Sequence, residues 1–248
     1  MRIYGTMKNK YNAIFVTGTD TGVGKTYISS LLLGFLRHQG LDAGYQKWLS
    51  SGGSDCADLN FCLEQNDITS DTDSADLQAV YCFKYPAAPH LAAKLEGREV
   101  DPERIISSFR EYERQKQIVV VEGVGGLLVP VRRDLLLADF LIRLELPTLI
   151  VARTGLGTIN HTLLTIEALR SRSLPILGII FSDDENDDQY DEMLLADNMQ
   201  TIAEFSQVPV FGRIRRQATY TEAEELFLAT GELFFKRLKK FIPDFPAP

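Results

Sequence analysis

Short apolar runs alternate with amphipathic stretches along most of the chain. The runs 13–17 (AIFVT) and 118–123 (IVVVEG) are apolar on successive residues, which is typical of strands that are buried on both faces. Similar runs follow at 147–152, 175–182 and 208–214. The stretches 25–40, 157–172 and 221–241 repeat apolar residues every three or four positions, as amphipathic helices do. This alternation predicts an α/β fold with a mostly parallel β-sheet and helices on both faces.

Length and composition agree with this fold. The chain has 248 residues, of which 45% are hydrophobic, so one domain over residues 1–248 can bury a full core. We expect a loose lead-in at 1–12 and a frayed, proline-rich tail at 242–248. The formal net charge of −8 argues against a protein that binds nucleic acid through overall positive charge. The sequence shows neither a signal peptide nor a stretch long enough to span a membrane, so we expect a cytoplasmic protein without a membrane partner.

The three cysteines, Cys56, Cys62 and Cys82, have a spacing that fits no common metal-binding motif. An odd number of cysteines in a protein expected in the cytoplasm favours reduced thiols over a disulfide framework.

The segment 18–26, GTDTGVGKT, lies between the first predicted strand and the first predicted helix. Glycine permits the conformations in which backbone N–H groups surround phosphate oxygens, and the N-terminus of the following helix favours an anion. Lys25 can then reach the outer phosphates, and the hydroxyl of Thr26 can bind Mg²⁺. A glycine-rich turn without a ligand is the alternative, but the strand before the loop and the helix after it favour a P-loop. The nucleotide-binding residues predicted here are Gly22, Val23, Gly24, Lys25, Thr26 and Tyr27.

The spacing of this loop and the residue at position 20 bear on the class of P-loop protein. The usual pattern has four residues between its first glycine and the Gly-Lys pair, whereas five residues lie between Gly18 and Gly24. Partition and division-site ATPases have a similar loop, but they carry a lysine where this chain has Asp20. Asp20 and the acidic composition therefore count against a switch ATPase that acts on nucleic acid or membranes.

The loop resembles that of the dethiobiotin synthetase family, which reads Gly-Thr-Asp-Thr-x-Val-Gly-Lys-Thr. Further similar segments follow in the same order as in that family and extend the resemblance from about Ala13 to Phe181. They are GYQKWLSSG at 44–52, SDCADL at 54–59, PAAPHLAAKLEGREVD at 86–101, VEGVGGLLVP at 121–130 and GTINHTLLT at 157–165. Several matches in one order are more specific than the glycine loop alone.

The resemblance implies a homodimeric enzyme that uses ATP and Mg²⁺ to close a cyclic urea on 7,8-diaminopelargonic acid with CO₂ or bicarbonate. One amine becomes a carbamate, the carbamate is phosphorylated, and the second amine displaces the phosphate. Phosphoryl transfer of this kind depends mainly on positioning and charge neutralisation. Two alternatives stay open: a partition-type or regulatory P-loop ATPase, and a related P-loop ligase that acts on another substrate.

Glu122 is predicted at the carboxyl end of a buried strand and is followed by Gly123, Val124 and Gly125. Open α/β sheets bind ligands at this edge, so Glu122 is a candidate Mg²⁺ ligand and the three residues after it are candidates for nucleotide contact. Asp55 could simply cap a helix, but the resemblance implies that it is a second carboxylate ligand. Together with the hydroxyl of Thr26, these carboxylates would form an oxygen-only site, which suits Mg²⁺.

Lys47 follows a short predicted strand, DAGYQ. The resemblance implies that its ammonium group holds the carbamate and neutralises the transferring phosphoryl group, as a preorganised charge can do. It also implies catalytic roles for Lys25 and Thr21, and substrate contacts for Thr21 and Ser51. Trp48 stands where the family usually has proline, so we expect the segment that carries Ser51 to follow a different course.

Two further regions are assigned through the resemblance. The helix that begins near Gly157 and Thr158 would receive the carboxylate of the substrate, partly across a dimer interface, although an ordinary helix cap fits the same residues. Ser182 and Asp183 stand where the family usually has an asparagine that reads the nucleotide base. Serine is shorter, and an ionised aspartate can only accept hydrogen bonds, so we predict that the protein tolerates several nucleoside triphosphates.

Overall fold

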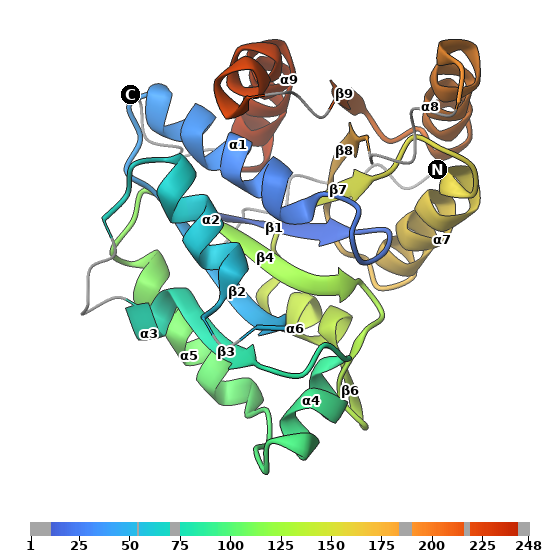
Figure 1. Ribbon diagram of the computed structural model, residues 1–248. Coiled ribbons are helices and arrows are strands. Elements are labelled where there is room, and N and C mark those ends of the chain that lie inside the picture. Colours follow the sequence, from blue (N-terminus) through green and yellow to red (C-terminus); the bar gives the residue numbers. More distant parts are fainter. Residues whose placement is uncertain (1–10, 54, 70–74, 184–189, 216–218, 243–248) are drawn as a thin grey trace.

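Seven parallel strands form one sheet, in the order β3-β2-β4-β1-β7-β8-β9. The strands are β1 Ala13–Gly18, β2 Ala43–Ser51, β3 Ala79–Phe83, β4 Ile118–Gly126, β7 Thr148–Ala152, β8 Ile176–Ser182 and β9 Val210–Ile214. The computed structural model in Figure 1 describes residues 11–53, 55–69, 75–183, 190–215 and 219–242. Most of the predicted lead-in and tail lie outside these described residues.

Helices cover both faces of the sheet (Figure 1). One face carries α1 (Lys25–His38), α2 (Ala57–Gln65) and α9 (Tyr220–Phe241). The other carries α5 (Pro102–Glu113), α6 (Leu137–Leu144), α7 (Thr158–Arg170) and α8 (Glu192–Ser206). The short elements are α3 (Ala75–Gln78), α4 (Pro89–Leu95), β5 (Pro130–Arg132) and β6 (Leu135–Leu136). The predicted fold class is confirmed, and no helix of the described chain combines the length and the apolar character needed to cross a bilayer.

The central strands are buried on both faces because their side chains alternate between two apolar clusters. In β1, Ile14 and Val16 pack into the cluster under α1 and α9, while Ala13 and Phe15 pack into the opposite one. The ring centroid of Phe15 lies 5.1 Å from that of Trp48. Each large apolar side chain buried in this way stabilises the fold by about 1.5–3 kcal/mol. The sheet therefore gives the loop after β1 a rigid base.

Strands β2 and β4 extend beyond their predicted ends. The predicted strand DAGYQ stops before Lys47, but β2 continues to Ser51 because β3 and β4 pair with it on its two sides. Strand β4 likewise continues past Glu122 to Gly126. Lys47 and Glu122 are therefore directly paired residues within the sheet, and not residues of the loops beyond it.

The prediction of three reduced thiols is wrong for two of the cysteines. Cys56 and Cys82 form a disulfide that joins the start of α2 to β3, and their Cα atoms lie 5.6 Å apart. Cys62 is a free, buried thiol. The cysteine spacing did not reveal this pair because 26 residues separate the two positions, and only the packing of α2 against the sheet brings them together.

Candidate active site

The loop after β1 has the backbone of a phosphate-binding loop. Gly22 and Gly24 have φ angles of 74° and 85°, a region that side chains other than glycine rarely adopt. Gly24 is also the N-cap residue of α1, so the free N–H groups of the first helical turn begin directly after it. The Nζ of Lys25 donates a hydrogen bond to the carbonyl oxygen of Asp20 at 2.9 Å, which folds the lysine back over the loop. This arrangement fits an anion held by backbone N–H groups and one ammonium group.

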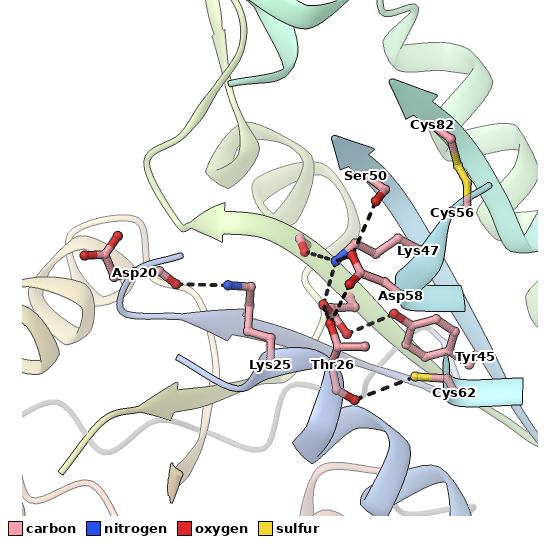
Figure 2. Close-up of polar contacts among 12 residues, drawn as sticks. Asp20, Lys25, Thr26, Tyr45, Lys47, Ser50, Cys56, Asp58, Cys62 and Cys82 are labelled. Carbon is pink, nitrogen blue, oxygen red and sulfur yellow. Dashed lines mark hydrogen bonds and ion pairs between the residues drawn. A yellow bond between two sulfur atoms is a disulfide. The ribbon is translucent and has the colours of Figure 1, made fainter. Parts of the chain in front are cut away.

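Four polar side chains from four elements meet beside this loop, and we call them the carboxylate cluster: Thr26, Lys47, Asp58 and Glu122 (Figure 2). The Nζ of Lys47 lies 2.6 Å from Oε1 of Glu122 and 2.7 Å from Oδ2 of Asp58. The hydroxyl of Thr26 lies 2.9 Å from Oε1 of Glu122 and 3.0 Å from Oδ1 of Asp58. Two carboxylates therefore share one ammonium group and one hydroxyl group.

Strand register and helix phase explain why these residues meet. Lys47 pairs directly with Glu122 across β2 and β4, which points the two side chains to the same face of the sheet. Thr26 lies in the first turn of α1, and Asp58 lies in the first turn of α2. Both helices cover that face, so their N-termini bring the hydroxyl and the second carboxylate to the pair.

Burial and charge act against each other in this cluster. Burial works to lower the pKa of Lys47, but the carboxylates of Glu122 and Asp58 outweigh it and raise that pKa above its ordinary value. Burial works to raise the pKa of Asp58, but the ammonium group of Lys47 outweighs it and lowers that pKa. Lys47 and Asp58 are therefore charged at neutral pH. Lys25 differs, because its burial lowers its pKa to about 8 despite the nearby Glu122.

A cavity of about 620 Å³ opens over the loop and the cluster. Of the predicted site residues, its lining includes Thr21, Gly22, Gly24, Lys25, Thr26, Tyr27, Lys47, Ser51, Glu122, Val124 and Gly125. The sequence reasoning missed Asp58, Ser50 and the apolar segment 86–89, which also line it. Helix phase could have indicated Asp58, because α2 begins after Cys56 and places Asp58, not Asp55, in its first turn.

On the other side of the glycine loop, the polar groups at the end of β8 bond to neighbouring side chains. Asp183 accepts hydrogen bonds from Nε and Nη2 of Arg213 at 2.8 and 2.7 Å, and from the hydroxyl of Thr154 at 2.9 Å. Ser182 is buried beneath the loop, where a Cβ atom at Gly24 would overlap its hydroxyl. Neither Ser182 nor Asp183 is part of the cavity lining described above.

Comparison with known proteins identifies the family. A family model described as an AAA domain matches residues 12–224. The chain is 36% identical to the ATP-dependent dethiobiotin synthetase of Methanococcus vannielii, over 87% of this chain and 99% of that protein. The synthetases of Rhodopseudomonas palustris and Lysinibacillus sphaericus are 39% and 34% identical, over 89% and 90% of this chain and 93% and 95% of theirs. The chain belongs to the ATP-dependent dethiobiotin synthetase family.

Solved structures of other P-loop proteins share the fold of this synthetase family member. The cell division protein complex MinC:MinD of Aquifex aeolicus superimposes with a TM-score of 0.56 at 15% identity, over 96% of this chain and 98% of that chain. The ParA of pNOB8, solved on nonspecific DNA, gives 0.55 at 13% identity, over 94% and 98%. At such low identity these similarities show the fold alone.

Some of the predicted site residues are not part of the cavity lining. Asp55 is exposed, and its backbone oxygen accepts a hydrogen bond from Asn60 at 2.8 Å, while Asp58 occupies the place beside Thr26. Gly157 is the N-cap of α7, with a φ angle of 87°, and Thr158 is buried behind it. Val23 packs into the apolar cluster under α1. Gly123 contributes its carbonyl oxygen, which accepts a hydrogen bond from Lys47 at 3.1 Å.

Proposed function

We propose that this protein is a dethiobiotin synthetase, a ligase that closes a cyclic urea on 7,8-diaminopelargonic acid with CO₂ at the expense of ATP. The observation that carries the proposal is the carboxylate cluster at the end of a phosphate-binding loop, in a chain of this family. A phosphoryl transfer needs an anion cradle, a metal site and a cation near the acceptor, and residues suited to each of these roles line the cavity.

The phosphates of ATP would lie on the loop 18–26, against the N-terminus of α1, with the ammonium group of Lys25 on the outer phosphates. Thr26, Asp58 and Glu122 would hold Mg²⁺, since two carboxylates and one hydroxyl form a hard oxygen set that leaves room for phosphate and water. The phosphates of ATP and water would supply the remaining ligands of the ion. The bound ion would neutralise phosphate charge.

Lys47 would supply the positive charge at the reacting carbamate. One amine of the diamine adds to CO₂ and loses a proton, and the carbamate oxygen then takes the γ-phosphoryl group of ATP, which releases ADP. The second amine attacks the carbamoyl carbon, and phosphate leaves as the urea ring closes. Lys47 is buried and charged at the cavity wall, which suits a group that neutralises the carbamate and the phosphoryl group in turn.

The remaining cavity residues would orient the diamine. Thr21, Ser50 and Ser51 line the same cavity as Lys47 and carry hydroxyl groups, and the apolar segment 86–89 would offer a surface for the alkyl chain. The substrate carboxylate would bind at the N-terminus of α7, at Gly157 and Thr158 of a second subunit, because these residues do not line the cavity of their own chain. Leu156 and Leu164, which are 64% and 59% exposed, would be covered in that homodimer.

The decisive experiment is a turnover assay with purified protein, MgATP and bicarbonate, with and without 7,8-diaminopelargonic acid. We expect ADP and dethiobiotin in equal amounts, and ADP only when the diamine is present. ADP release that does not depend on the diamine but increases with DNA or lipid vesicles would instead support a regulatory ATPase. Turnover with another diamine only would support a related ligase.

The dimer has its own test. Sedimentation at assay concentration should show a homodimer, and Leu164→Glu should dissociate it and abolish turnover together. A fully active monomer would rule out a site shared between subunits.

A further inference from the structure

The two carboxylate oxygens of Glu122 have different surroundings. Oε1 faces the carboxylate cluster, with Lys47 at 2.6 Å and Thr26 at 2.9 Å. Oε2 accepts a hydrogen bond from the hydroxyl of Tyr45 at 2.9 Å. Glu122 and Tyr45 both have 0% exposed surface. Water therefore cannot replace the tyrosine as the partner of Oε2.

Tyr45 is fixed by the same strand that carries Lys47. The two residues are two positions apart on β2, so their side chains lie on the same face of the sheet. The ring of Tyr45 packs in the apolar cluster under α1 and α2, which holds its hydroxyl in one place. A buried hydroxyl in such a cluster needs a hydrogen-bond partner, and Oε2 of Glu122 supplies it.

We propose that Tyr45 is a positioning residue for the metal site: its hydroxyl holds Oε2 of Glu122 and so keeps Oε1 turned toward Thr26, another of the proposed metal ligands. This inference rests on the proposed function. Without the tyrosine hydroxyl, Oε2 loses the hydrogen bond that Tyr45 donates, and the carboxylate gains freedom to rotate. Partners in the outer shell of metal sites commonly change metal affinity or activity by about 10–100-fold when they are removed. Tyr45 would therefore act through Glu122, without touching nucleotide or substrate.

The chain offers a matched control. Tyr112 is also a buried tyrosine, but its hydroxyl accepts a hydrogen bond from Gln78 at 2.9 Å, away from the cluster. Both Tyr45→Phe and Tyr112→Phe remove one buried hydroxyl group and keep the ring. Only Tyr45→Phe should change metal binding if the tyrosine acts through Glu122.

The test is calorimetric binding of a non-hydrolysable ATP analogue to the full-length protein, once as its Mn²⁺ complex and once without metal. We expect Tyr45→Phe to weaken binding of the Mn²⁺ complex about tenfold and to leave the metal-free analogue within about twofold. Tyr112→Phe should leave both within about twofold. Equal binding of the Mn²⁺ complex by Tyr45→Phe and the unchanged protein would overturn the inference, as would equal losses with and without metal.

A second pair of variants tests whether Tyr45 acts only through Glu122. Glu122→Gln removes the buried charge, so Glu122→Gln and Tyr45→Phe/Glu122→Gln can be compared directly. We expect the two to bind the Mn²⁺ complex equally, because Tyr45 acts only through the carboxylate. A further loss in the double variant would contradict this. If Glu122→Gln binds the Mn²⁺ complex as well as the unchanged protein, the proposed metal site fails and the inference fails with it. If only Tyr45→Phe has no effect, the metal site stands.

Discussion

The two sides of the glycine loop differ in how their charged side chains are held. On the side of β2 and β4, the carboxylate cluster lies on the cavity wall, and its ammonium and hydroxyl groups hold the carboxylates in place. On the other side, after β8, Asp183 is held by Arg213 and Thr154, and these contacts use its oxygens. Both regions contain charge pairs, so a charge pair by itself does not mark a ligand site. The difference is that the cluster lines the cavity, whereas Asp183 is not part of that lining.

The carboxylate cluster and the Asp183 network therefore have separate roles. The cluster presents oxygen ligands and a cation to phosphates, which every nucleoside triphosphate carries. The Asp183 network fixes β8 against β9 and has no free acceptor on the Asp183 carboxylate with which to read a base. Substitutions in the cluster should therefore affect chemistry and metal use, whereas substitutions in the Asp183 network should affect stability.

The largest effect is expected at Lys47. Lys47→Ala should lower kcat by about 10²-fold or more, as the loss of one preorganised charge does. It also leaves Glu122 buried without its cation, so thermal unfolding should be measured alongside turnover. Lys116→Ala is the control, because Lys116 pairs with Asp42 at the surface. A folded Lys47→Ala protein with unchanged kcat would remove Lys47 from the mechanism.

The next effect separates two neighbouring carboxylates. Asp58→Asn should raise the Mg²⁺ concentration needed for half-maximal turnover about tenfold or more, because Asp58 lies beside Thr26 and Lys47. Asp55→Asn should change it by less than about twofold, since Asp55 is exposed and outside the cavity lining. The measurement is a Mg²⁺ titration of initial rates. A larger increase for Asp55→Asn than for Asp58→Asn would mean that Asp55, and not Asp58, is the metal ligand.

A pH effect should appear at the phosphate-binding lysine. Burial lowers the pKa of Lys25 to about 8, so its ammonium group loses its proton as the pH rises through that value. Phosphate binds the charged form, and affinity for the metal-free ATP analogue should fall by up to about tenfold per pH unit above that pKa. Lys25→Met should bind weakly at every pH. Constant affinity between pH 7 and pH 9 would show that Lys25 stays charged.

Base preference should be weak in this protein. Turnover with ATP, CTP, GTP and UTP at matched Mg²⁺ should give kcat/KM values within about tenfold of one another, since a missing hydrogen-bond pair removes roughly 1 kcal/mol of discrimination. A much stronger preference for ATP would mean that backbone groups or other side chains read the base.

The smallest effect on catalysis is expected from Asp183→Asn. The substitution removes the charge that pairs with Arg213, so the free energy of unfolding should fall by about 1–3 kcal/mol in chemical denaturation. The relative use of the four nucleotides should stay within about twofold of the unchanged protein. A clear change in nucleotide preference at unchanged stability would place Asp183 at the base.

The sequence by itself determined the features that depend on neighbouring residues. The apolar runs predicted β1, β4, β7, β8 and β9, and the three- to four-residue repeats predicted α1, α7 and α9, each within a few residues of its bounds. The glycine loop was readable for the same reason, since its glycines, lysine and threonine are contiguous. The local pattern also indicated Glu122, and the family resemblance indicated Lys47, although Glu122 was predicted at the end of its strand and Lys47 after its strand, whereas both lie within strands.

Only the tertiary structure decided how distant segments meet. Lys47 and Glu122 are 75 residues apart, and Tyr45 and Glu122 are 77 apart, so no local period relates them. The register of β2 against β4 sets both contacts at once. The phase of α2 selects Asp58 over Asp55, and packing of α2 against the sheet pairs Cys56 with Cys82. Apolar periodicity shows which face of an element is buried, but contacts across the sheet depend on how whole elements pack together.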